Sequence, residues 1–268
     1  MNFYKYIQIL SIDVVVGACV STLFLSHLLH SPLSNISVMA LGISVWLIYT
    51  ADHLWDARKN ENPCTLRHAF HQHNFIVLSV VWVVVASIGG SILFFLPLLI
   101  LKLGGVLLFV VVLYFLMLYF WAEKSALIKE FVIALLYTMG IFIPPIGTGV
   151  SVQLSVGIWL FSLYFLLAFI NVLIFTLYDE SDDRIDGHSS IVISFGKKNV
   201  ILFTKILLTV GLMVLLIGRG VILYDYVFFM MFLILGSLLF FQDKLRNNGW
   251  YRILGDGIFI LPVISWWV

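Results

Sequence analysis

The chain has 268 residues, of which 62% are hydrophobic and only 11% are charged, with a mean hydropathy of +1.09 and a formal net charge of +1. Because a soluble globular domain carries about 25% charged residues, this composition excludes a water-soluble protein and indicates one whose solvent is lipid. The nearly neutral charge gives no basis for binding nucleic acid. The cysteines Cys19 and Cys64 are too few for a disulfide framework.

Nine apolar runs are long enough to cross a bilayer, since a helix of about 20 residues spans a hydrocarbon core of about 30 Å. The first is too long for a signal-peptide core and lacks a small-residue cleavage site, so we expect it to be retained. Only Leu96-Pro97 separates the third and fourth runs, and counts of eight or ten also fit. In chain order, the expected helices are 6–29, 36–54, 75–95, 98–121, 128–149, 154–177, 199–218, 220–241 and 250–268.

The sequence therefore predicts an all-α polytopic membrane protein, with about nine transmembrane helices around a central cavity. No long polar stretch divides the chain, so we expect one domain over residues 1–268. Nine spans put thirteen Lys and Arg residues on the side of the N-terminus and leave only Lys102 and Arg219 on the other. This asymmetry predicts a cytoplasmic N-terminus, and we expect the protein in a bacterial inner (cell) membrane.

Two long polar loops on the expected cytoplasmic side, residues 52–74 and 179–199, carry most of the aspartates. Three aspartate pairs have i,i+4 spacing, which is more than random placement of ten aspartates gives: Asp52 with Asp56, Asp179 with Asp183, and Asp182 with Asp186. Where a helix leaves the membrane, this spacing stacks the carboxylates on one helical face. A solvated helix end is the alternative reading of any single pair.

Stacked carboxylates repel one another unless a cation lies between them. Carboxylate oxygens suit Mg²⁺, which takes one or two carboxylates together with the phosphate oxygens of a substrate. Arg and Lys residues also lie near the two motifs in the sequence. Two acidic motifs on one side of the membrane therefore predict a diphosphate held between metal ions.

These residues resemble the UbiA superfamily of intramembrane prenyltransferases. Asp179-x-x-x-Asp183-Arg184-x-x-Gly187, followed by Ser190 and Gly196, is similar to the family's DxxxDRxxGxxTLxxxxG, with Ser190 where Thr is usual. The family's first signature, NxxxDxxxD, is altered. In this chain Asp52 takes the place of the usual Asn, Asp56 that of the first Asp, and Asn60 that of the second. Lys129-Glu130 also looks like a recurring family element.

The resemblance implies that Mg²⁺ is the cofactor and that a prenyl diphosphate is one substrate. Its tail would lie among the helices and its head between the acidic motifs, and a lipophilic, aromatic acceptor would attack the allylic cation. The metal would be held by Asp52, Asp56, Asn60, Asp179 and Asp183. By the same resemblance, the candidates to neutralise the diphosphate further are Arg67, Lys124, Lys129 and Arg184. The same resemblance leaves open a terpene cyclase, and a non-enzymatic lipid transporter or binding protein is a rival of another class.

Asp13 and Asp256 fall within apolar runs. A carboxylate at such depth costs about 2.5–3.5 kcal/mol, so both should face the protein interior. Each is a candidate to bind an acceptor or take its proton, and pairing with Lys205 or a buried hydroxyl is the alternative. Asn171, eight residues before Asp179, should share its helical face and could orient the substrate or make a packing hydrogen bond. His68, His71 and His73 are read as part of a polar loop, because no Cys or acidic partner completes a tetrahedral metal site.

Overall fold

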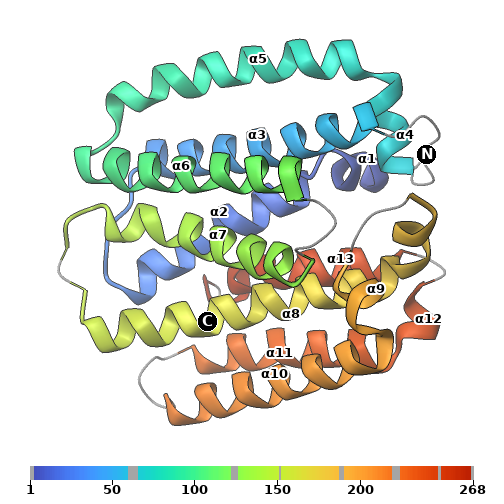
Figure 1. Cartoon of the computed structure of the whole chain (residues 1–268). Helices are drawn as coiled ribbons and strands as arrows, with labels where there is room; N and C mark the ends of the chain where they lie inside the picture. The colour runs from blue at the N-terminus through green and yellow to red at the C-terminus, as the bar shows by residue number, and fades with distance from the viewer. Residues whose placement is uncertain are drawn as a thin grey trace.

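The computed structural model describes residues 3–59, 66–121, 126–150, 152–186, 190–218, 224–246 and 249–266, and all regular structure within these ranges is helical (Figure 1). The elements are α1 Phe3–Ile9, α2 Ile12–Leu28, α3 Asn35–Lys59, α4 Leu66–His73, α5 Phe75–Ile92, the 3₁₀ helix η1 Leu93–Phe95, α6 Leu98–Trp121, α7 Ala126–Ile146, α8 Leu154–Asp186, α9 Ile191–Phe195, α10 Lys197–Ile217, α11 Asp225–Phe240, α12 Gln242–Arg246, α13 Trp250–Gly257 and the 3₁₀ helix η2 Ile258–Trp266.

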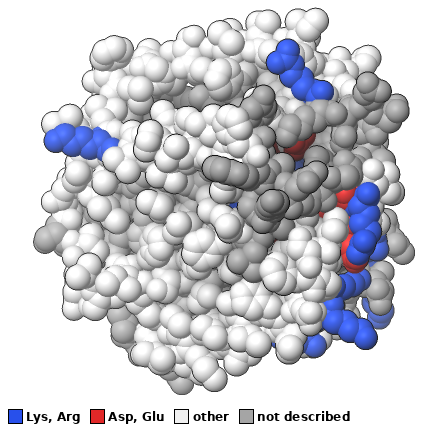
Figure 2. Space-filling model, viewed as in Figure 1, with Lys and Arg blue, Asp and Glu red and all other residues white. Residues whose placement is uncertain are grey.

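Six of these helices are long and apolar enough to cross a membrane: α3, α5 with η1, α6, α7, α8 and α10. The apolar helices α2 and α11 are shorter, and the expected ninth span is α13 followed by η2. The protein is therefore an integral membrane protein of the all-α class, while the count of nine spans stays a prediction. On the face shown in Figure 2, most charged side chains gather at the end of the molecule where α4, α9 and α12 lie.

The first expected helix, 6–29, is wrong as a single element, because the chain breaks into α1 and α2. Ser11 lies at the break with φ of 54°, a left-handed conformation that no continuous helix allows. Its side chain is buried, and its Oγ lies 3.2 Å from Nε2 of His53 on α3. This contact ties the break to the neighbouring helix.

Helices α3 and α8 run past the ends that apolarity alone predicts. The second expected span ends at residue 54, but α3 continues to Lys59, and α8 continues nine residues beyond its expected end to Asp186. The stretches expected as polar loops are therefore partly helical, with α4 and α9 following the two long helices. This extension places the aspartates with i,i+4 spacing on helix faces, as their spacing predicted.

Helix α8 is the centre of the bundle and packs against α7, α10 and α11. Of its apolar window, 61% is buried inside the protein, compared with 6% for the span formed by α5 and η1. Helix α5 packs mainly on α3 and lies at the upper edge of Figure 1. Polar side chains on α8 consequently face other helices, while α5 presents its Val and Ile side chains to lipid.

Two prolines lie near the end of α7, and hydroxyl groups from other segments compensate for them. Pro145 has no N–H to donate to the carbonyl of Ile141, four residues earlier. The buried Thr22 on α2 donates its hydroxyl to that carbonyl at 2.7 Å. Ser31 likewise donates to the carbonyl of Pro145 at 2.6 Å. These contacts give the carbonyls of Ile141 and Pro145 donors from outside α7.

Candidate functional site

A polar cavity of about 830 Å³ lies between α1, α3, α4, α7, α8 and α13. The two acidic motifs, which are separated by more than a hundred residues in the sequence, both line it. Its acidic side chains are Asp52 and Asp56 from α3, Glu130 from α7, Asp179, Asp182 and Asp183 from α8, and Asp256 from α13. The expectation that the motifs share one cavity is confirmed by this geometry.

Asp179 is held by two residues of α13. Arg252 Nη2 donates to Asp179 Oδ2 at 2.6 Å, and the Tyr251 hydroxyl donates to Oδ1 at 2.5 Å. The Tyr251 ring stacks on that of Tyr178, with centroids 4.3 Å apart. The Arg252 guanidinium lies over the ring of Phe175, 5.6 Å from its centroid. This carboxylate is therefore fixed in position and partly neutralised by the protein itself.

Arg252 belongs to the site. From the sequence it is only one of the thirteen Lys and Arg residues expected on the cytoplasmic side of the membrane. A signal was present, because Arg252 and Asp256 have i,i+4 spacing and so share one face of α13. Both line the cavity. The contact with Asp179 has no such signal, since it depends on how α13 packs against α8.

Asp13 and Asp256 are 6% and 9% exposed, which confirms that both face the protein interior. Asp256 lines the cavity directly, whereas Asp13 does not, although its chain neighbour Val14 does. Asp13 Oδ1 accepts the N–H of Val14 at 3.0 Å. Its Oδ2 is buried and has no hydrogen-bond partner among the described residues.

The helices that carry these two carboxylates pack closely because Gly17 on α2 faces η2. A Cβ at Gly17 would lie 3.0 Å from Cβ of Phe259 and 3.7 Å from the carbonyl oxygen of Asp256. Lys205, the partner that the sequence offered, is remote from this packing: it lies over the ring of Phe240 at 5.4 Å. The buried acids therefore belong to the cavity side of the bundle.

Asn171 lies on α8 two turns before Asp179 and, as predicted, lines the same cavity. It is buried, and its Oδ1 has no hydrogen-bond partner among the described residues. Gly255 on α13 makes room for it, because a Cβ there would lie 2.6 Å from that oxygen. An amide placed in this way can hydrogen-bond to a molecule in the cavity.

Four basic side chains line the cavity: Lys5, Arg67, Lys129 and Arg252. Arg67 Nη2 also donates to the carbonyl of Gln8 at 3.4 Å. Burial lowers the pKa of the Arg67 guanidinium, but its ordinary value is so high that the group stays cationic at neutral pH. These cations suit a strongly anionic ligand.

Arg184 is placed elsewhere. Its side chain is 57% exposed and pairs with Glu180 at 3.1 Å, and it does not line the cavity. Lys124 and Asn60, the other two candidates for this site, lie outside the described residues.

Glu130 ties the cavity wall to the short helix that follows the second motif. Its Oε1 accepts the N–H of Ile191, the first residue of α9, at 3.2 Å. Its Oε2 is buried without a hydrogen-bond partner among the described residues, as is the hydroxyl of Ser190, and both residues line the cavity. The sequence marks Glu130 only through the family resemblance.

The donor set fits a metal ion that is shared with a phosphate group. In the part of the chain that the structure describes, no three His, Cys, Asp or Glu side chains form a ready-made metal cluster. Mg²⁺ does not require one, because it keeps waters and takes one or two carboxylates plus phosphate oxygens. Each oxygen of Asp179 has a second lone pair beyond its contact with α13. Carboxylates facing each other across one polar cavity meet this requirement.

The histidines of residues 68–73 lie on α4 rather than in an irregular loop. His71 is buried, its Nδ1 donates to the carbonyl of Arg67 at 2.9 Å, and its ring centroid lies 5.0 Å from that of His53. Burial lowers the pKa of His71. This arrangement packs α4 on α3, so the reading as a polar loop is wrong for the buried His71, while His68 lines the cavity.

Comparisons with known proteins establish the fold. No protein-family model matches the chain, and no curated protein sequence matches it. Among solved structures, the chain is similar to a UbiA homolog from Aeropyrum pernix K1 in its apo state, with 13% identity, 95% of this chain and 98% of that chain covered, and a TM-score of 0.69. It is also similar to a structure described as digeranylgeranylglyceryl phosphate synthase in membranes, with 14% identity, 97% of each chain covered and a TM-score of 0.58. The chain has the UbiA fold, as the resemblance led us to expect.

Proposed function

We propose that this chain, which has the UbiA fold, is a Mg²⁺-dependent intramembrane prenyltransferase that moves a polyprenyl group from a prenyl diphosphate to a lipophilic, aromatic acceptor. One observation carries the proposal. Aspartates from α3 and α8 face a single polar cavity that also holds four Lys and Arg side chains, inside a bundle whose helices expose many large apolar side chains. A prenyl diphosphate has the same division, with a highly charged head and an apolar chain.

The head group is held in this cavity by charge. Arg67 and Lys129 approach from α4 and α7 and neutralise the diphosphate oxygens. Asp52, Asp56, Asp179 and Asp183 would hold Mg²⁺, which would supply further stabilisation of the negative charge that develops on the leaving group. Asn60 at the end of the first motif completes the proposed donor set.

The reaction breaks the bond between the allylic carbon and the diphosphate oxygen, and the diphosphate leaves with the electron pair. The acceptor forms a bond to the allylic carbon and loses a proton. Asp256, whose buried carboxylate lines the cavity from α13, takes this proton, and the buried Asp13 is the second candidate for the same role. Asn171 orients the acceptor through its unpartnered amide oxygen.

The similar structures support a reaction of this class. One is named for a UbiA homolog and the other for digeranylgeranylglyceryl phosphate synthase in membranes. An acceptor of lipid character agrees with the lipid-facing surface of this chain, and the positive-inside asymmetry favours a cavity that opens to the cytoplasm of a bacterial cell.

The direct test is product analysis by mass spectrometry. Purified protein is incubated with Mg²⁺, several prenyl diphosphates, and a pool of native lipids and quinone precursors. We expect diphosphate release that requires an acceptor and stops with EDTA. Release without any acceptor would indicate a terpene cyclase instead, and no release from any prenyl diphosphate would favour a transporter or lipid-binding protein.

A matched pair of variants ties activity to the cavity. Asp183→Asn removes a charge from the cavity lining, whereas Glu180→Gln removes one from the same helix at a position that pairs outward with Arg184. We expect Asp183→Asn to lose at least about a hundredfold in rate and Glu180→Gln to stay near the wild type. Equal activity in both variants would rule out the proposed site.

A further inference from the structure

Arg252 on α13 spends only part of its hydrogen-bonding capacity on the protein. Its Nη2 donates to Asp179 Oδ2 at 2.6 Å, and its Nε donates to the hydroxyl of Tyr251 at 3.1 Å. The other N–H groups of the guanidinium make no hydrogen bond within the part of the chain that the structure describes. Because Arg252 lines the polar cavity, these groups are available to an anion that binds there.

Aromatic rings hold the guanidinium in this place. It lies 5.6 Å from the centroid of the Phe175 ring and 5.3 Å from that of Tyr251. A cation is attracted to the face of an aromatic ring whichever anion it also contacts. The guanidinium can therefore turn from Asp179 to a second anion in the cavity and remain against the same rings.

A second guanidinium faces the same cavity from α4. Arg67 lines the cavity, and its pKa is lowered first by burial and then by the positive charge of Arg252. Two cations that oppose each other are stabilised by an anion between them. Asp179 supplies such an anion to Arg252, and a diphosphate would supply one to both guanidinium groups.

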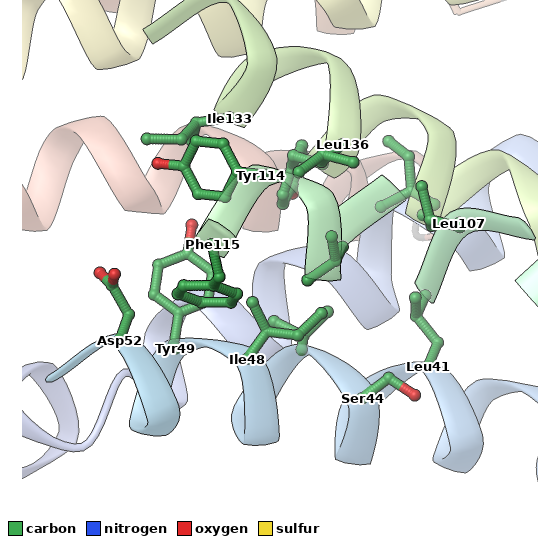
Figure 3. Close-up of a pocket in the computed structure, with 15 residues that line it drawn as sticks. Leu41, Ser44, Ile48, Tyr49, Asp52, Leu107, Tyr114, Phe115, Ile133 and Leu136 are labelled. Carbon is green, nitrogen blue, oxygen red and sulfur yellow. The ribbon is translucent and has the colours of Figure 1, made fainter. Parts of the chain in front are cut away.

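This pair of α8 and α13 belongs to the polar part of the site. A second cavity, of about 150 Å³, adjoins the polar one between α3, α6 and α7, and its lining is almost entirely apolar (Figure 3). Asp52 lines both cavities, and in Figure 3 its carboxylate lies at one end of the apolar one, while Leu41 and Leu107 lie at the other. Asp179 and Arg252 line the polar cavity alone. A charged ligand therefore meets them on the side away from the apolar wall.

A divalent cation at Asp179 opposes the contact with Arg252. The second lone pair of each carboxylate oxygen leaves room for the cation, but the cation and the guanidinium would then share one small anion, and their positive charges repel. Arg252 is more stable if it donates instead to an anion on the far side of the cation. A diphosphate oxygen is such an anion, and the planar fork of arginine suits phosphate.

We propose that Arg252 competes with a divalent cation for Asp179 and, when the cation binds this carboxylate, passes its hydrogen bonds to the diphosphate. The inference rests on the proposed function and adds to it a residue that couples the binding of the two ligands. The cation alone, or the diphosphate alone, binds at the expense of the contact between Arg252 and Asp179. The two together give every group a partner, so each ligand raises the affinity for the other through Arg252.

Binding of Mn²⁺ alone tests the competition, with electron paramagnetic resonance to measure the free ion. Wild type, Arg252→Gln and Lys129→Gln are compared in lipid nanodiscs. Lys129→Gln removes the same charge from the lining of the same cavity, but from a residue that does not hold Asp179. We expect Arg252→Gln to bind Mn²⁺ at least about tenfold more tightly than the wild type, and Lys129→Gln less than about threefold more tightly. Equal affinities in the two variants would overturn the competition.

An unreactive analogue, geranylgeranyl S-thiolodiphosphate, tests the transfer. Its affinity is measured with EDTA and with excess Mn²⁺, and the affinity of the analogue itself for Mn²⁺ cancels when variants are compared. We expect the gain in affinity that Mn²⁺ gives to be at least about ten times larger in the wild type than in Arg252→Gln. In Lys129→Gln the gain should stay within about threefold of the wild type. An equal gain in Arg252→Gln and the wild type would overturn the transfer.

Arg252→Lys covers the case in which Arg252→Gln does not fold. It keeps the charge but lacks the planar fork, so both measurements should shift in the same direction as in Arg252→Gln, by smaller factors. Wild-type values, or shifts in the opposite direction, would overturn the proposal. A wild-type protein that shows the expected coupling but releases no diphosphate from any prenyl diphosphate would defeat the proposed reaction and support the exchange at Arg252.

Discussion

The ends of α3 and α8 carry the same spacing of aspartates but place them in different surroundings. Asp179 on α8 is fixed by Arg252 and Tyr251 and borders only the polar cavity. Asp52 on α3 borders both the polar cavity and the apolar one. The same i,i+4 pattern therefore gives one carboxylate that is hydrogen-bonded to α13 and another that lies at the boundary between the polar cavity and the apolar one. A motif specifies a spacing, and packing decides what each member does.

The largest effect is expected from Asp179→Asn. The amide keeps one oxygen, which can accept from Arg252 or from Tyr251 but no longer from each on its own oxygen, and it loses the charge that the metal requires. Diphosphate release should fall by about a thousandfold, with the protein still folded. The check is a release assay over a series of Mg²⁺ concentrations beside Glu180→Gln. Wild-type rates in Asp179→Asn would show that the carboxylate of Asp179 takes no part in the reaction and that the end of α8 has a structural role alone.

Asp52→Asn should lower the rate by about a hundredfold. It restores the residue type usual in the family at this position but removes a carboxylate from the boundary between the two cavities. The measurement is again diphosphate release, with a short and a long prenyl diphosphate. Full activity would show that Asp52 is no more than a polar helix end that takes no part in binding the metal.

A second substitution sharpens this result. Residues 52, 56 and 60 are spaced by four in the sequence, an interval at which positions on an ideal helix drift by only about 40° per step, although Asn60 itself lies outside the described residues. Adding Asn60→Asp to Asp52→Asn should therefore recover at least about tenfold of the lost rate, whereas Asn60→Asp alone should be tolerated. A double variant no better than Asp52→Asn would mean that a carboxylate at position 60 cannot replace the one at position 52.

Arg252→Lys tests the contacts by which α13 holds Asp179 of α8. Lysine keeps the charge but loses the planar group that contacts Asp179 and Tyr251 together and stacks on Phe175. Because the Arg252 and Asp179 side chains are 27% and 17% exposed, the loss of stability should be modest, about 1 kcal/mol. Thermal unfolding in lipid nanodiscs measures it. A stability equal to that of the wild type would show that these contacts of Arg252 do not stabilise the protein.

A last pair of variants concerns Glu130. Glu130→Ala removes the acceptor for the first N–H of α9 and should cost about 1–2 kcal/mol of stability. Glu130→Gln keeps an acceptor oxygen and should lie close to the wild type. Thermal unfolding of the two variants side by side checks this order, and a larger loss in Glu130→Gln would mean that its charge matters more than its hydrogen bond.

Much of the fold follows from the sequence because lipid imposes simple rules. The cost of a carboxylate in hydrocarbon predicted that Asp13 and Asp256 face inward, and the spacing of Asn171 and Asp179 predicted their shared face. The break at Ser11 could not be predicted, since it depends on a left-handed residue in an unbroken apolar run. The pairing of Arg252 with Asp179 depends on the approach of α13 to α8 at Gly255, which no local pattern encodes.

The prolines of α7 bear on how the protein is made. The carbonyl of Ile141 has no donor within its own helix and takes the hydroxyl of Thr22, which lies on α2. In hydrocarbon such a carbonyl costs several kcal/mol if it is left unpaired. Because α2 precedes α7 in the chain, its hydroxyl is already in the bilayer when α7 is synthesised. Insertion of α7 is thus coupled to docking on a helix made earlier, and the order of synthesis supplies the missing donor at the time it is needed.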